Sequence, residues 1–207
     1  MIAIIDYGVG NLFSLQSSLK FIGQDVAVTS DSAIIEAADR IILPGVGAYE
    51  DAARKLRESG MADIVMAQAK AGKPLMGICL GMQLLFEKSY EYGEHEGLGL
   101  IKGKVVPIKG YAPADYKIPH IGWNALTFRG RAAEGGEPLF KYTKEGDHVY
   151  FVHSYYAADC EDSTIAVTEY GAELTAAVAD GKIYGCQFHP EKSGSVGLNL
   201  LRAFCEL

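Results

Sequence analysis

Short apolar runs alternate with segments of helical periodicity through the first 88 residues. The run RIILPG at 40–45 is apolar almost throughout, as expected of a parallel strand that helices cover on both faces. The other strand-like runs lie at 2–5, 25–30 and 73–78, and the helical segments lie at 11–23, 33–38, 50–58, 61–71 and 80–88. This alternation favours an α/β fold with a parallel sheet between two helical layers.

The second half of the chain is rich in strand-like segments separated by turns of Gly, Asp and Lys, as in antiparallel hairpins. These segments lie at 97–109, 117–128, 147–158, 163–170, 173–180 and 182–190, and an amphipathic helix is predicted at 197–207. The stretch 129–147 is expected to form a variable loop. No linker or repeat interrupts the chain, so we predict one domain over 1–207, with a mixed, mostly parallel sheet flanked by helices.

Charge and hydropathy exclude several classes of function. The net charge is −7 and no basic patch is present, which disfavours a nucleic-acid partner. No apolar stretch reaches the roughly 18 residues that a membrane span needs. The first residues also lack the charged region and cleavage site of a signal peptide. We therefore expect a cytoplasmic protein that does not engage a membrane.

The four cysteines lie far apart, without CxxC pairs or metal-ligand spacing. This pattern predicts free thiols in a reducing compartment, and neither a disulfide framework nor a metal site. Cys160, Cys186 and Cys205 are typical of small buried apolar residues. Cys79 differs from them because a glycine lies two residues to either side of it, in GICLG at 77–81.

The GICLG motif has the spacing of a nucleophile elbow, in which a strand turns sharply into a helix. Gly77 and Gly81 remove side chains that would clash at such a turn. The turn would hold the Cys79 thiol at a helix N-terminus, where the helix dipole favours the thiolate, and the N–H of Leu80 would face the same space. The motif alone is equally compatible with a packed cysteine whose glycines serve only close packing.

A cysteine nucleophile needs a general base and a group that orients the base. His189 ends an apolar run, and Glu191 follows two residues later in FHPE. If the backbone stays extended through Pro190, both side chains point to one face, and Glu191 can accept from one ring nitrogen of His189. A strand-end turn is the alternative interpretation of His-Pro-Glu. The other histidines are expected in a polar loop or in strands without an acid to orient them: His95, His120, His148 and His153.

Two glycine-containing loops follow the first and third predicted strands. In LPGVGAYE at 43–50, Gly45 and Gly47 would let backbone N–H groups approach a substrate closely. The sequence GVGNLF at 8–13 is similar to a dinucleotide-binding fingerprint, but Phe13 occupies the position of the third small residue. We therefore expect no nucleotide cofactor there.

These motifs together resemble those of the class I, or triad, glutamine amidotransferases. The class resemblance rests on PGVG, GICLGMQ and FHPE. A narrower resemblance, to the glutaminase subunits of imidazole glycerol phosphate synthase (HisH-type), rests on IIDYGVGNL, KIPHIGWN, YFVHSYY and FHPEKSGSVGLNLL. The resemblance implies a flavodoxin-like α/β fold as a single type-1 glutamine amidotransferase domain, and it implies no cofactor and no metal.

The resemblance also implies a role for each matching residue. In the catalytic triad, Cys79 would be the nucleophile, His189 the general base and acid, and Glu191 the third member. The implied oxyanion-hole residues are Gly45, Val46, Gly47 and Leu80, and the implied substrate-binding residues are Gln83, His153, Ser154 and Tyr155. The residues implied to face a (β/α)8-barrel cyclase subunit are Asn11, His120, Trp123, Asn124 and Lys192.

The implied reaction is hydrolysis of glutamine to glutamate and ammonia, which the cyclase partner of a heterodimer would use to form imidazole glycerol phosphate in histidine biosynthesis. Three other interpretations remain open from the sequence. The chain could serve another synthase, of the pyridoxal phosphate or anthranilate type. It could be a stand-alone cysteine hydrolase. It could also be a non-catalytic binding module.

Overall fold

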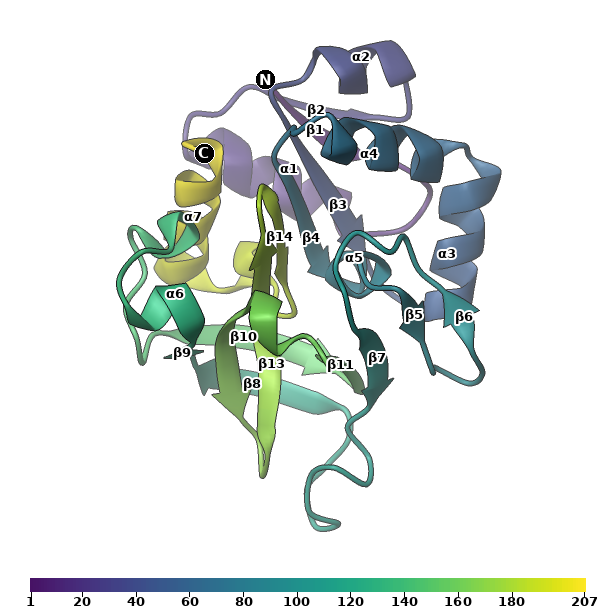
Figure 1. Ribbon diagram of the computed structural model, residues 1–207. Coiled ribbons are helices and arrows are strands. Elements are labelled where there is room, and N and C mark those ends of the chain that lie inside the picture. Colours follow the sequence, from purple (N-terminus) through teal and green to yellow (C-terminus); the bar gives the residue numbers. More distant parts are fainter.

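The computed structural model describes all 207 residues and is built around an eight-stranded sheet with the order β2-β1-β3-β4-β14-β13-β12-β9 (Figure 1). The neighbours from β2 to β14 pair in parallel, and the remaining pairs are antiparallel. The predicted mixed, mostly parallel sheet flanked by helices is therefore confirmed. No helix combines the length and the apolar character that crossing a membrane requires.

The elements of the first half follow the predicted alternation closely. They are β1 (Ile2–Ile5), α1 (Leu12–Phe21), β2 (Val26–Thr29), α2 (Ser32–Ala37), β3 (Arg40–Gly45), α3 (Tyr49–Glu58), α4 (Met61–Lys70), β4 (Leu75–Cys79) and α5 (Leu80–Leu84). The second half contains β5 (Lys88–Ser89), β6 (His95–Glu96), β7 (Lys104–Pro107), β8 (His120–Ala125), β9 (Thr127–Phe128), α6 (Gly130–Ala133), β10 (His148–His153), β11 (Tyr155–Ala158), β12 (Thr164–Glu169), β13 (Glu173–Asp180), β14 (Ile183–Cys186) and α7 (Gly194–Cys205). Three 3-10 turns complete the chain: η1 (Pro138–Phe140), η2 (Glu161–Ser163) and η3 (Pro190–Lys192).

The parallel strands bury both faces, as their continuous apolar character predicts. Alternate residues of β1 enter different hydrophobic clusters, with Ile4 on one face and Ile5 on the other. Helices α1 and α7 cover the first face, whereas α2, α3 and α4 cover the second (Figure 1). Complete burial of one such isoleucine contributes about 1.5–3 kcal/mol to folding.

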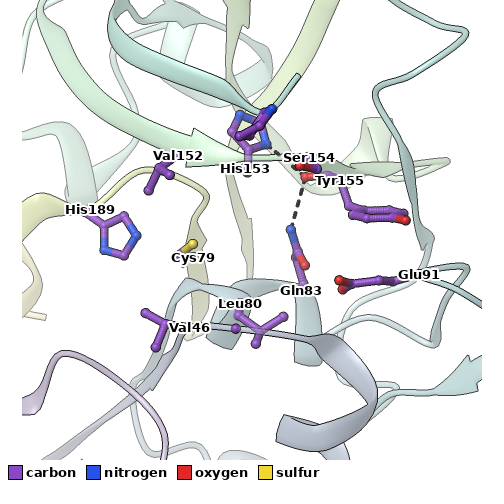
Figure 2. A pocket seen from close by; sticks show the side chains of 12 residues that line it. Val46, Cys79, Leu80, Gln83, Glu91, Val152, His153, Ser154, Tyr155 and His189 are labelled. Carbon is purple, nitrogen blue, oxygen red and sulfur yellow. Dashed lines mark hydrogen bonds between the residues drawn. The ribbon is translucent and has the colours of Figure 1, made fainter. Parts of the chain in front are cut away.

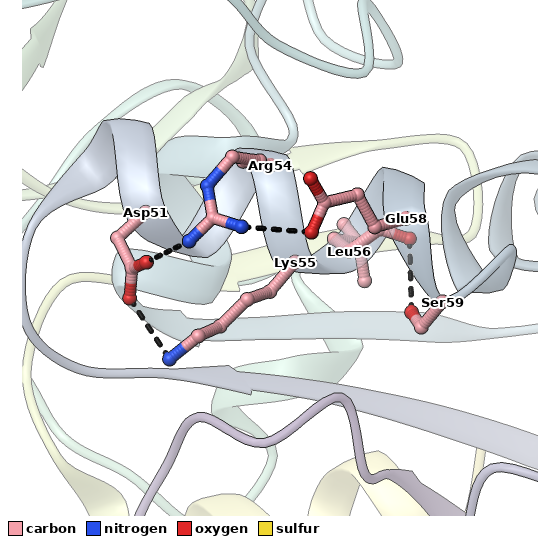
Figure 3. A network of polar contacts seen from close by, with 6 residues as sticks. All are labelled: Asp51, Arg54, Lys55, Leu56, Glu58 and Ser59. Carbon is pink, nitrogen blue, oxygen red and sulfur yellow. Dashed lines mark hydrogen bonds and ion pairs between the residues drawn. The ribbon is translucent and has the colours of Figure 1, made fainter.

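Helix α3 shows how the outer helices divide their surface. Its inner side buries Tyr49 and Leu56 against the sheet. Its outer side carries ion pairs of Arg54 with Asp51 and with Glu58, and of Lys55 with Asp51 (Figure 3). Exposed pairs of this kind each contribute only about 0.3–0.5 kcal/mol, so this charged network is a solvated face and not a candidate site.

Two small sheets lie beside the carboxyl end of the large sheet. Strand β10 pairs with β8, and β11 joins β7, β5 and β6. The predicted strand at 147–158 is therefore divided at Ser154 between two sheets, and the predicted strand at 117–128 is divided at Leu126. Each break changes the sheet to which the chain is bonded, and the break at Ser154 turns the chain toward the end of β4.

Two expectations for the intervening segments differ from the structure. The helix predicted at 80–88 ends at Leu84, because the buried residues Leu85 and Phe86 lead directly into the short strand β5. The segment 129–147 is not a simple loop. It contains α6 and η1, and it buries Leu139 and Phe140 in the main core.

Candidate functional site

Cys79 lies at the junction where β4 ends and α5 begins. Its backbone has φ +55° and ψ −113°, a conformation that costs a non-glycine residue about 1–3 kcal/mol. The side chain is 7% exposed. The strand-to-helix turn expected from GICLG is present, and the surrounding structure holds the thiol in a strained position at the sheet edge.

Three glycines permit this turn because backbones meet where side chains would be. A Cβ on Gly81 would lie 1.9 Å from the Leu43 carbonyl oxygen, and a Cβ on Gly77 would lie 2.6 Å from the Gly81 carbonyl oxygen. A Cβ on Gly45 would lie 2.6 Å from the Gly81 nitrogen. Gly45 therefore supports the elbow from behind, whereas the next two residues, Val46 and Gly47, line the cavity in front of the thiol.

His189 and Glu191 form a buried pair that faces the same region. The His189 Nδ1 and Glu191 Oε1 atoms are 2.8 Å apart, and the side chains are 4% and 3% exposed. The expected extended backbone through Pro190 is wrong, because residues 190–192 form the 3-10 turn η3. The turn brings the carboxylate back beneath the imidazole. The predicted pair is therefore present, although the backbone after His189 turns and does not stay extended.

The electrostatics favour a protonated His189. Burial lowers the pKa of His189, but its interactions with the Cys79 sulfur and with the Glu191 carboxylate outweigh burial and raise the pKa to about 9. An imidazolium at this position can stabilise a thiolate and later deliver a proton.

A cavity of about 320 Å³ joins the thiol and the imidazole. Figure 2 shows Cys79 and His189 on one side of the cavity and Glu91 on the other. The lining residues come from the ends of β3 and β4, from α5, from the bend between β10 and β11, and from three loops. They are Val46, Gly47, Cys79, Leu80, Gln83, Glu91, Pro119, Val152, His153, Ser154, Tyr155 and His189.

Gln83 projects from α5 into this cavity, but its amide nitrogen already makes hydrogen bonds within the protein. Its Nε2 donates to the Tyr155 carbonyl at 3.1 Å and to Gln187 Oε1 at 2.9 Å (Figure 2 shows the first of these bonds). Gln187 is completely buried, and its own Nε2 lies 3.7 Å from the Cys79 sulfur. Sequence reasoning missed Gln187, although it stands two residues before His189 in the same run.

Glu91 is a second residue that sequence reasoning missed. Its segment, EYGEHEG, has the composition of a solvated loop. In the structure Glu91 Oε2 accepts a hydrogen bond from the Tyr49 N–H at 3.1 Å, and the carboxyl group reaches the cavity (Figure 2). Burial raises the pKa of Glu91 from its usual value. The single sequence signal was an acidic residue shortly after the elbow helix.

His153 connects the cavity wall to a buried histidine behind it. Its Nδ1 donates to the Tyr155 carbonyl at 2.8 Å, and its Nε2 lies 2.9 Å from His120 Nδ1. His120 Nε2 lies 2.8 Å from Asn124 Oδ1, and Asn124 Nδ2 donates to the Glu169 carbonyl at 3.1 Å. Burial lowers the pKa of both imidazoles, that of His153 to about 3.

The prediction that His120 faces a partner is wrong, because its side chain is 0% exposed. Its ring stacks between Phe151 and Tyr170, with centroid distances of 5.0 and 4.0 Å. Strand β8 alternates its faces, so His120 points inward while the neighbouring Ile121 and Trp123 are 58% and 53% exposed.

Other residues predicted to face a partner do reach the surface. Trp123 packs edge-to-face on Tyr150 with ring centroids 6.0 Å apart, and Lys192 Nζ lies 5.8 Å from the centre of the Tyr150 ring. Asn11 precedes α1 and lies beside His189 and Glu191. Asn124 is partly exposed on β8. Of these residues, Asn11 lies nearest to the thiol-bearing cavity, because it shares a small pocket with Val46 and His189, which also line that cavity.

Comparison with known proteins identifies the protein family that has this fold and these sequence motifs. The family model for class-I glutamine amidotransferases matches residues 3–206. The fold alone is also shared with a solved glutamine amidotransferase, with TM-score 0.75, 20% identity and 100% and 98% coverage of the two chains. The PurLQS structure from Thermotoga maritima gives TM-score 0.75, 21% identity and 99% and 97% coverage. The chain belongs to the class-I glutamine amidotransferases.

Curated relatives narrow the assignment within that family. The chain is 50% identical to the imidazole glycerol phosphate synthase subunit HisH of Caldanaerobacter subterraneus subsp. tengcongensis, with 100% and 98% coverage of the two chains. It is 46% identical to the subunit of the same name from Lactococcus lactis, with 99% and 98% coverage. The chain is a glutamine amidotransferase of the HisH type.

The raised pKa of His189 predicts a pH-dependent stability. The imidazole has an ordinary pKa of 6.5 and a folded-state pKa of about 9. The stabilisation is therefore complete below about pH 6.5 and is lost as the pH rises through about 9. We expect the free energy of unfolding of the wild type, relative to His189→Asn, to fall by about 2–3 kcal/mol between pH 6.5 and 9.5 in urea titrations. The exposed His148→Asn variant is the control, and an unchanged difference would contradict the assignment.

Proposed function

We propose that this cavity hydrolyses the side-chain amide of glutamine, and that the chain supplies the ammonia to a cyclase subunit of imidazole glycerol phosphate synthase. The observation that carries the proposal is the convergence on one cavity of a thiol at a strained elbow and a buried, carboxylate-bound imidazole. That combination provides a nucleophile, a proton carrier and an orienting group.

The chemistry begins with attack of the Cys79 thiolate on the amide carbon of glutamine. The carbonyl becomes an oxyanion, which the N–H groups of Leu80 and of the Val46–Gly47 loop stabilise by about 3–4 kcal/mol per donor. His189 then gives its proton to the leaving nitrogen, so ammonia departs and a thioester remains. His189, now neutral, takes a proton from water, and the resulting hydroxide releases glutamate and restores the thiolate.

The polar groups around the cavity match the two ends of a glutamine molecule. The Glu91 carboxylate, opposite the thiol, is suited to the α-ammonium group. The free Oε1 of Gln83 and the main chain at His153, Ser154 and Tyr155 are suited to orienting the rest of the substrate. The cavity volume of about 320 Å³ is at the lower end of small-molecule sites and accommodates one amino acid.

The second part of the proposal concerns the partner. The curated relatives are named as subunits of a synthase, which supports a partner subunit. We take this partner to be the (β/α)8-barrel cyclase of a heterodimer, as the sequence resemblance implies. The surface around Trp123 is suited to this contact because it combines exposed apolar side chains, Ile121 and Trp123, with Lys192 and with Asn11 beside the thiol-bearing cavity. Ammonia released there would pass to the partner without entering water. A single domain over 1–207 and a cytoplasmic location fit this role.

All three alternatives left open by the sequence lose support. Relatives that are 44–50% identical over nearly the whole chain carry the HisH name, which favours this synthase over the pyridoxal phosphate and anthranilate types. Membership of the class-I glutamine amidotransferases disfavours a stand-alone hydrolase of another class and a non-catalytic module.

Labelling with a glutamine-like electrophile tests the nucleophile. We expect Cys79 to react selectively and glutamine to protect it, because Cys79 alone of the four thiols opens into the cavity with His189. Burial raises the pKa of Cys160, which serves as the internal comparison. Peptide mass spectrometry after labelling measures both sites, and equal modification of Cys160 would overturn the assignment.

A further inference from the structure

Gln187 has a buried side-chain amide next to the candidate triad, and it takes no part in the steps proposed for glutamine hydrolysis. It follows β14, is 0% exposed, and is held to β13 by the hydrogen bond from its main-chain N–H to the Ala176 carbonyl at 2.8 Å. Its side chain does not line the cavity. It therefore approaches the Cys79 sulfur from inside the protein, while His189 approaches from the cavity side.

The orientation of the Gln187 amide follows from one main-chain carbonyl. A carbonyl oxygen only accepts hydrogen bonds, so the Gln83 atom that faces the Tyr155 carbonyl must be the amide nitrogen. The same nitrogen faces Gln187, so the Gln187 atom nearest to it must be the amide oxygen. The Gln187 nitrogen is thereby directed to the Cys79 sulfur, 3.7 Å away. Reversing either amide would place two acceptors or two donors against each other.

A fixed N–H donor on sulfur has a clear electrostatic effect. Hydrogen bonds to the charged form of an ionisable group favour that form, and the thiolate is the nucleophilic form of cysteine. The elbow gives the sulfur little exposure to water, so protein groups must replace the solvent around a negative charge. Cys186 lies one residue before Gln187 and is also completely buried, and there burial raises the pKa of the thiol.

We propose that Gln187 is a further catalytic residue, whose Nε2–H donates a hydrogen bond to the Cys79 sulfur and stabilises the thiolate in attack and in release from the thioester. The inference rests on the proposed glutaminase function, and it adds a hydrogen-bond donor that acts on the nucleophilic sulfur. It also assigns a second role to Gln83, which orients the Gln187 amide as well as facing the substrate.

The test is the pH profile of Cys79 alkylation in Gln187→Met, a substitution of similar length that lacks the donor. We expect the midpoint of the iodoacetamide rate profile to move to higher pH by about one unit, the lower end of the shift that loss of a hydrogen bond to a charged group produces. We expect kcat/KM for glutamine at pH 7 to fall about tenfold. Gln187→Asn withdraws the amide by one methylene and should shift the profile in the same direction, which keeps the test available if Gln187→Met does not fold.

The matched control is Thr168→Val. Thr168 is also completely buried, and its hydroxyl donates to the Ala125 carbonyl at 2.9 Å, away from the thiol. We expect this variant to lose stability without moving the alkylation profile. An unchanged profile in both folded Gln187 variants would overturn the role of Gln187. If wild-type Cys79 were not preferentially alkylated and glutamine were not hydrolysed, the proposed function itself would fail instead.

Discussion

A Cys79→Ala variant is expected to lose glutamine-dependent synthesis by at least about a thousandfold, while its complex with the cyclase still makes product from ammonium salts. Removal of the nucleophile leaves only substrate binding and the oxyanion donors, which cannot form the thioester. The substitution deletes one sulfur atom at the edge of the core, and the surface that carries Trp123 and Lys192 is built from other elements. The complex should therefore form, and the partner should need only free ammonia.

The measurement compares initial rates with glutamine and with ammonium chloride for the wild type and the variant, each in complex with the cyclase. Cys160→Ala is the control, because Cys160 is also buried but lies among Thr164 and Thr175, away from the cavity. It should retain both activities. The glutaminase proposal is falsified if the Cys79→Ala complex turns over glutamine at the wild-type rate. Loss of the ammonium-dependent rate as well would contradict the separate partner surface.

Glu191→Gln is expected to lower kcat by about a hundredfold to ten-thousandfold with little change in KM. The carboxylate accepts a hydrogen bond from His189 Nδ1–H, with the nitrogen and oxygen atoms 2.8 Å apart, and it stabilises the imidazolium. An amide oxygen can accept the same hydrogen bond but carries no charge. Because the imidazolium forms and discharges during the chemical steps, the loss should appear in turnover and not in glutamine binding. Steady-state kinetics of glutamine hydrolysis measure both constants.

Glu58→Gln is a suitable control for this experiment, because it neutralises an exposed carboxylate of the α3 ion-pair network far from the cavity (Figure 3). It should leave both constants unchanged. A Glu191→Gln enzyme with full kcat would show that the buried pair serves only the fold of the His-Pro-Glu turn.

The parallel half of the fold was predictable because its signals are local. Continuous apolar runs identify doubly covered strands such as β3 and β4, and the GICLG spacing identifies the turn at Cys79 before any packing is known. The second half was less predictable. Its strands change sheets at Leu126 and Ser154, and such a change depends on which distant strand is available for pairing.

The residues of the candidate site also differ in how far the sequence predicts them. Residues in sequence motifs, Cys79 and His189, were foreseen, whereas Glu91 and Gln187 were not, because their contacts come from other elements. His120 shows the opposite failure. A motif match predicted it at a surface, but the alternation of β8 turns its ring inward while Trp123 faces outward. Strand register determines which of these side chains faces the core and which faces the solvent, and short motifs do not specify it.

The imidazoles of His120 and His153, behind the cavity, carry fewer ring protons when both are neutral than their contacts require. Three contacts hold it: His153 to the Tyr155 carbonyl, His153 to His120, and His120 to Asn124 Oδ1. Both end atoms only accept, so the three contacts require three ring protons, and two neutral imidazoles carry two. Because burial lowers the pKa of both rings, the neutral pair is favoured and one contact lacks its proton. The number of hydrogen bonds that fix the His153–Tyr155 wall of the cavity therefore depends on a single proton.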